Sequence, residues 1–121
     1  MRILLVQASQ SEGMVPVSPL GLAYLAGRLH KMGHEIRSFD LPFHEEYKQG
    51  LNKAIVEFCP DVIGVSLRNL DNQRYSAPVS FLPEAREVVK TCRESSKAKI
   101  IVGGSGFSIA PEQLLDYLGV D

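Results

Sequence analysis

The stretch "KIIVGGSGFSIAPEQLLDYLG", residues 99–119, contains one complete strand–loop–helix unit. Its apolar run 100–102 is typical of a short strand. Three glycines and two serines follow within residues 103–108, and 111–118 then has helical spacing, with Gly119 in place to end the helix. Because the glycines come where the strand ends, we expect this backbone to approach something closely, either a ligand or another part of the chain.

The same unit occurs three more times upstream. Strands are predicted at 3–6, 36–39 and 61–67, and helices at 19–32, 47–58 and 82–92, the first with Ser18 as its N-cap. Strand–helix alternation requires right-handed crossovers and therefore predicts a parallel sheet between two helical layers, a three-layer α/β sandwich. We expect the flavodoxin-like strand order 2-1-3-4-5, with Val120 and Asp121 starting a fifth strand that is truncated or missing. A half-Rossmann order is the alternative.

Composition narrows the class of protein. The 121 residues suffice for one domain, 1–121, with a single core. A net charge of -1 without a basic block favours neither nucleic acid nor an anionic membrane as partner, and no apolar stretch approaches the length of a membrane span. Cys59 and Cys92 lack metal or redox spacing, so we expect both to be buried free thiols in a protein of the reducing cytoplasm.

Both strand orders place a ligand beyond the carboxyl ends of the strands. The loops 7–17, 68–80 and 103–110 meet at that edge and are the most polar stretches of the chain. The candidate binding residues are Ser9 after the first strand, Ser66, Leu67, Arg68 and Asn69 at the end of the third, and Gly103, Gly104, Ser105 and Gly106 after the fourth. The alternatives are a Ser66 hydroxyl bonded to neighbouring backbone, polar side chains that only shape their loop, and glycines that only turn the chain.

Several familiar kinds of site are excluded or weakly supported. A receiver domain needs acidic residues after the first and third strands, where this chain has Gln7-Ala8-Ser9 and Ser66-Leu67. A dinucleotide fingerprint needs a third glycine and the first strand, and "GSGFSI" has neither. No histidine has metal-ligand spacing, and no nucleophile–base pair is legible. The sequence therefore predicts no catalytic and no metal-ligating residue, and leaves open whether the chain belongs to an enzyme.

Taken together, four segments resemble the cobalamin (vitamin B12)-binding domain that precedes the radical SAM domain of many bacterial and archaeal enzymes. The resemblance covers nearly the whole chain, and its proline–leucine–glycine–leucine helix start, its "GHE" turn and its glycine pair are fairly specific in combination. The segments are "ILLVQAS" (3–9), "SPLGLAYLAGRLHKMGHEIRSFD" (18–40), "PDVIGVSLRNLDN" (60–72) and "IIVGGSGFSIAPEQLL" (100–115).

The resemblance implies a function for the candidate site. The corrin ring would lie on the carboxyl edge of the sheet, and its nucleotide tail would pass Gly103 and Gly104 with a hydroxyl contact from Ser66. The domain would present cobalamin to a downstream radical SAM domain in the same chain, in many such proteins for methyl transfer. S-adenosylmethionine and a 4Fe-4S cluster are expected only in that downstream domain, so the resemblance implies that residues 1–121 are a fragment of a longer protein.

Two departures from the family pattern qualify this expectation. Many cobalamin domains carry Asp-x-His-x-x-Gly after the first strand, whereas "QASQSEGMVPV" (7–17) contains no histidine, so no cobalt ligation is expected from this loop. The usual Ser-x-Leu is replaced by Ser66-Leu67-Arg68. The alternative function is a flavodoxin-like small-ligand-binding or protein-interaction module without cobalamin. A Cys-x-x-x-Cys-x-x-Cys run beyond Asp121 in the parent gene would discriminate between the two.

Overall fold

The computed structural model describes residues 1–8 and 15–120, and within them it forms one parallel sheet. The strands are β1 (Arg2–Gln7), β2 (Glu35–Asp40), β3 (Val62–Ser66) and β4 (Lys99–Gly103), in the order β2-β1-β3-β4. Because β1 pairs directly with β3, the flavodoxin-like order is confirmed and the half-Rossmann order is wrong. Val120 is not in a strand, and Asp121 lies outside the described residues.

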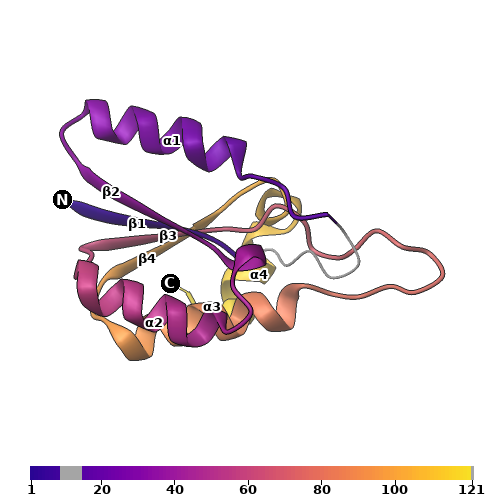
Figure 1. Ribbon diagram of the computed structural model, residues 1–121. Coiled ribbons are helices and arrows are strands. Elements are labelled where there is room, and N and C mark those ends of the chain that lie inside the picture. Colours follow the sequence, from indigo (N-terminus) through magenta and orange to yellow (C-terminus); the bar gives the residue numbers. More distant parts are fainter. Residues whose placement is uncertain (9–14, 121) are drawn as a thin grey trace.

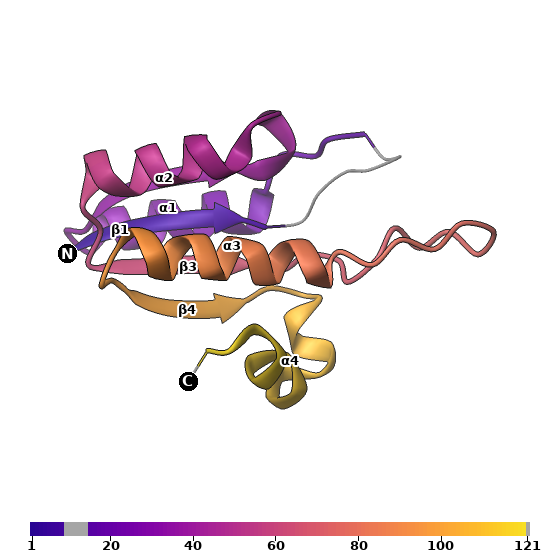
Figure 2. The same cartoon turned by 90° about the horizontal axis from the view of Figure 1, so that it is seen from below.

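The helices cover both faces of this sheet, which confirms the three-layer sandwich. Helix α1 lies on one face, and α2 and α3 lie on the other, while α4 lies at the β4 edge (Figures 1 and 2). In the described part of the chain none of the helices is long and apolar enough to cross a membrane. The helices are α1 (Leu20–Lys31), α2 (Tyr47–Phe58), α3 (Leu82–Ser95) and α4 (Pro111–Leu118), with short 3-10 turns at Leu41–Phe43 and Phe107–Ile109.

The two faces of the sheet are packed very differently. The face toward α2 and α3 carries the hydrophobic core, in which Leu4 and Val6 of β1 meet Ile55 of α2 and Val88 of α3. On the opposite face, α1 contributes no fully buried residue, although its apolar residues recur at the predicted helical spacing. Helix α1 therefore approaches the sheet at β1 and β2 but packs against it only partly.

Two local details differ from the sequence-based expectation. Helix α1 begins at Leu20, so Pro19 and not Ser18 occupies the N-cap, and no side chain caps this end. The Pro19 carbonyl accepts the first intrahelical bond, from the Ala23 amide at 3.0 Å. Cys59 is exposed rather than buried: it follows the last turn of α2 in a left-handed conformation (φ 49°), and its thiol lies 3.1 Å from the carbonyl oxygen of Val56.

The two free cysteines are expected to differ sharply in reactivity. Burial raises the pKa of the Cys92 thiol to about 12, so its reactive thiolate is almost absent at neutral pH. At pH 8 a thiol reagent such as DTNB should label Cys59 within minutes and Cys92 only after denaturation. Cys59→Ser is the matched control, since it should abolish the fast phase. Rapid labelling of Cys92 in the folded Cys59→Ser protein would contradict this account.

Candidate functional site

The register of the sheet brings residues from three strands into two adjacent rows. Gln7, Ser66 and Gly103 are mutual neighbours at the carboxyl ends of β1, β3 and β4. Leu5, Gly64 and Ile101 form the next row, two residues earlier in each strand. Because side chains alternate along a strand, both rows face the same side of the sheet, which is the side of α1.

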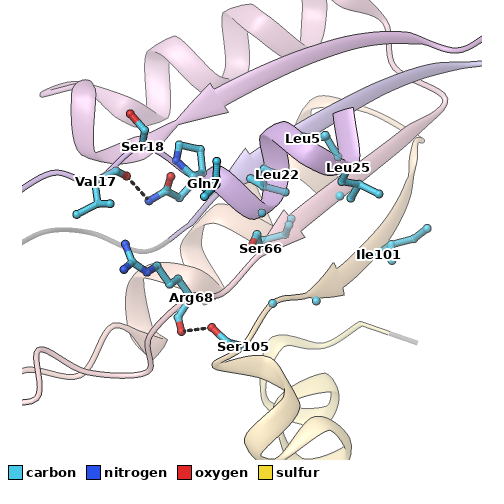
Figure 3. A pocket seen from close by; sticks show the side chains of 17 residues that line it. Leu5, Gln7, Val17, Ser18, Leu22, Leu25, Ser66, Arg68, Ile101 and Ser105 are labelled. Atoms are coloured by element: carbon cyan, nitrogen blue, oxygen red, sulfur yellow. Dashed lines mark hydrogen bonds between the residues drawn. The ribbon is translucent and has the colours of Figure 1, made fainter. Parts of the chain in front are cut away.

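Between these rows and α1 lies a slot with a volume of about 690 Å³ (Figure 3). The absence of a side chain at Gly103 leaves that part of its floor open, whereas at Gly64 the Leu5 side chain already lies 3.0 Å from where a Cβ would stand. Helix α1 forms the opposite wall. The slot begins at the carboxyl edge, as predicted, but it continues beneath α1 along the strands. Its lining comprises Leu5, Gln7, Val17, Ser18, Pro19, Leu20, Gly21, Leu22, Leu25, Gly64, Val65, Ser66, Arg68, Ile101, Gly103, Gly104 and Ser105.

The slot is polar at its mouth and apolar inside. Gln7, Ser18, Ser66, Arg68 and Ser105 gather toward the carboxyl ends of the strands, whereas Leu5, Leu25 and Ile101 lie further along the sheet (Figure 3). Ile101 is 52% exposed and Leu25 45%, although both line the space between the sheet and α1. This distribution of polar and apolar residues suits an elongated ligand whose inner end is apolar and whose part at the mouth is polar.

One corner of the mouth contains buried acceptors without partners. Gln7 is only 4% exposed and its side-chain amide lies 3.5 Å from the Val17 carbonyl oxygen, but its Oε1 accepts no hydrogen bond in the described chain. Asp40, the register neighbour of Gln7 on β2, has an equally unpartnered Oδ1. Burial raises the pKa of Asp40, partly offset by the nearby His44. Unpaired buried acceptors are uncommon in folded proteins, and here they sit beside the slot.

The structure separates the predicted site residues into two groups. Ser66, Arg68, Gly103, Gly104 and Ser105 all line the slot. Leu67 does not, because its side chain is only 1% exposed and belongs to the core on the opposite face. Asn69 and Gly106 also lie outside the lining, and Ser9 lies outside the described residues.

The glycines after β4 serve different purposes. Gly104 has φ +106°, and a Cβ placed on it would lie 2.5 Å from the Leu67 carbonyl oxygen. A Cβ on Gly106 would lie 3.0 Å from the same oxygen, which accepts a hydrogen bond from the Gly106 amide at 2.8 Å. At Gly103 a Cβ would meet nothing within 4 Å. The close approach at Gly104 and Gly106 is therefore made by the chain's own backbone, and Gly103 opens toward the slot.

Sequence reasoning missed most of the apolar lining. Leu5, Gly64 and Ile101 were not predicted as site residues, because nothing in their local sequence distinguishes them from core positions. Gln7 was predicted only as part of the edge loop 7–17. A usable signal was their spacing: Leu5, Gly64 and Ile101 each precede an edge residue by two, so they share its face of the sheet. What the sequence could not supply was the gap between that face and α1.

The fold and the slot define a small-ligand-binding domain of the flavodoxin-like class, with its site at the topological switch point. Residues 14–121 match the family model for the B12 binding domain, and the chain belongs to that family. This finding confirms the resemblance noted in the sequence, and a module without cobalamin is not favoured.

Two curated relatives and two solved structures show the same relationship. The chain is 31% identical over 107 residues to a tryptophan 2-C-methyltransferase from Streptomyces laurentii, covering 88% of this chain and 18% of that protein. It is 31% identical over 104 residues to a hopanoid C-3 methylase from Methylococcus capsulatus, covering 84% and 18%. Two structures of the radical S-adenosylmethionine methyltransferase TsrM from Kitasatospora setae superpose with a TM-score of 0.90 at 30% identity.

The two TsrM structures differ in what they contain, and each match covers nearly all of this chain but a small part of the TsrM chain. One TsrM structure contains tryptophan and an analogue of S-adenosylmethionine, and the other contains cobalamin and a [4Fe-4S] cluster. Each match covers 99% of this chain, but only 22% and 21% of the TsrM chains. The chain thus spans about a fifth of the length of the relatives that it matches.

Proposed function

We propose that this domain binds cobalamin with the corrin ring against the carboxyl edge of the sheet and the nucleotide tail in the slot beneath α1. The observation that carries this proposal is the shape and polarity of the slot: it opens at the switch point, is polar at its mouth and becomes apolar along β1, β3 and β4. Cobalamin has the matching form, a polar phosphate and ribose that connect a wide ring to a flat aromatic base.

Different residues of the slot would bind different parts of cobalamin. Leu5, Leu22 and Ile101 provide an apolar channel, from which an aromatic base would displace water. Ser66 and Gln7 offer hydrogen-bonding groups to the sugar, and Arg68 brings a cation to the mouth, where it complements a phosphate. When bound, cobalamin supplies cobalt-centred methyl-transfer chemistry, and these residues hold and orient it.

We infer further that residues 1–121 are one domain of a longer, cytoplasmic radical SAM enzyme. The support is the length of the relatives, of which the chain spans about a fifth, and the S-adenosylmethionine analogue and [4Fe-4S] cluster in the TsrM structures. In such an enzyme this domain presents the corrin ring to the part that holds the cluster and S-adenosylmethionine, for transfer of a methyl group. The domain itself contributes binding and orientation.

The direct test is binding of hydroxocobalamin by the purified protein, followed by its visible absorption after gel filtration. We expect one cobalamin per chain to co-elute, and flavin mononucleotide, offered in parallel, to separate from the protein. Retention of the flavin without retention of cobalamin would overturn the proposal in favour of an ordinary flavodoxin-like module.

Bound cobalamin is expected to have no histidine cobalt ligand from the loop 7–17 or from His44. Residues 7–17 contain no histidine, and His44, at the same edge, stacks on Phe39 with 4.2 Å between ring centroids, on the core side of the sheet. His34 lies near the amino terminus of the chain, with its Nδ1 3.4 Å from the Met1 nitrogen. Electron paramagnetic resonance of the cob(II)alamin form should show no nitrogen hyperfine splitting that disappears in a His44→Ala variant.

A further inference from the structure

A long arm leaves the carboxyl edge directly beside the slot. We define the arm as residues 69–80, between the end of β3 and α3; it runs out from the body of the domain and returns alongside itself (Figures 1 and 2). Asp71 and Ser80 form an antiparallel bridge, and the backbone N–H of Asn72 donates a hydrogen bond to the Val79 carbonyl oxygen at 3.0 Å. The predicted polar loop is therefore a narrow hairpin-like projection.

Asn72 fixes the conformation of the arm from within. It is only 5% exposed, its Nδ2 donates to the Ala77 carbonyl at 2.9 Å, and its Oδ1 accepts from the Val79 and Arg74 amides at 3.0 and 3.2 Å. These bonds cross the arm and hold its tip without any hydrophobic core. A segment that is already ordered loses little conformational entropy when it binds a partner.

The tip of the arm presents side chains that are exposed in the part of the chain that the structure describes. Tyr75 is 104% exposed, and its neighbour Arg74 is also exposed. Tyrosine and arginine are the residue types that most often carry binding energy in protein interfaces. The base of the arm is tied to the site, because the Ser105 hydroxyl donates to the Arg68 carbonyl at 2.9 Å.

We propose that the arm is a docking element for the protein domain that closes over the far side of the corrin ring. This rests on the proposed function, in which that domain is the radical SAM part of the same polypeptide. The arm starts at the edge where the corrin would lie and runs away from the sheet (Figure 2), so its tip would extend beyond that edge toward the partner domain. The length of the relatives leaves ample chain to supply the partner surface.

The side chains at the tip of the arm predict which kind of partner surface it would bind. Tyr75 offers an aromatic ring with one hydroxyl, and Arg74 offers a guanidinium on the adjacent residue. Asp71, the nearest acidic residue in the sequence, already accepts a hydrogen bond from the Gln73 backbone amide at 2.7 Å. We therefore expect the partner surface to combine an apolar pocket for the ring with a carboxylate for Arg74.

The test is site-specific photo-crosslinking in the full-length protein loaded with hydroxocobalamin. A benzophenone amino acid at position 75 should crosslink to peptides beyond residue 121 of the same polypeptide. The same amino acid at position 24 is the control, because Tyr24 is 75% exposed but lies on α1. Crosslinks from position 75 no stronger than those from position 24 would overturn the proposal. So would crosslinks between isotopically labelled and unlabelled copies, which would indicate a dimer contact.

A second pair of variants tests whether the preformed shape matters. Asn72→Ala removes all three side-chain hydrogen bonds and should lower the crosslinking yield from position 75 several-fold, while Asn72→Asp retains both acceptor bonds and should keep most of it. An unchanged yield in Asn72→Ala would overturn the claim that docking depends on the preformed shape of the arm. The cobalamin spectrum is recorded on every sample, so that loss of cobalamin with retained crosslinks counts against the proposed function and not against docking.

Discussion

Gly104→Ala is expected to destabilise the fold by about 3 kcal/mol, since one methyl group there meets two obstacles at once. The residue has φ +106°, a conformation that side-chain-bearing residues rarely adopt, and the new Cβ would lie 2.5 Å from the Leu67 carbonyl oxygen. Relief requires the loop after β4 to move away from β3. The melting temperature of the ligand-free protein should fall by roughly 10 °C, measured by circular dichroism.

The adjacent glycine provides the matched control. Gly103 lies outside the left-handed region, and a Cβ placed on it meets nothing within 4 Å. Gly103→Ala should therefore melt within ~2 °C of the wild type, because it neither strains the backbone nor displaces an atom. Equal melting temperatures for the two alanine variants would show that the contact between Gly104 and Leu67 does not constrain the fold.

Most of the secondary structure could be predicted from the sequence. The elements were predictable because their signals are local: apolar runs mark β1 and β3, and Gly119 ends α4 with φ +67° as expected. The parallel sheet followed from the strand–helix alternation, whereas the choice between the flavodoxin-like and half-Rossmann orders needed the structure. Both orders place the site at the carboxyl edge, so its position could be predicted without that choice.

What the sequence could not supply depends on distances between elements. Leu67 follows Ser66 directly and was predicted to contact the ligand, but strand alternation turns its side chain into the core and leaves only its backbone near Gly104. The apolar stripe of α1 predicts a packed helix, yet α1 has no fully buried residue and leaves a slot between itself and the sheet. Because a hydrophobic stripe is the same whether protein or ligand covers it, no sequence pattern distinguishes a core from a slot.

Gly103→Val is expected to weaken cobalamin binding by roughly ten- to a hundred-fold, the largest effect on binding that we expect from one substitution. Gly103 is the register neighbour of Ser66 and lines the slot, so three added carbons would enter the space assigned to the nucleotide tail. Overpacking a tight site costs ~1–3 kcal/mol, and each factor of ten in affinity corresponds to about 1.4 kcal/mol.

Although Gly103→Val should bind cobalamin more weakly, its folded state should be as stable as that of Gly103→Ala. Valine is favoured in strands, and the space around the new Cβ is empty in the ligand-free domain, so the melting temperature should remain close to that of Gly103→Ala. Cobinamide, which has the corrin ring but no nucleotide tail, separates the two parts of the site. If the slot holds the tail, Gly103→Val must weaken binding of cobalamin far more than binding of cobinamide. An equal loss for both ligands would place the obstruction under the ring and would remove the tail from the slot.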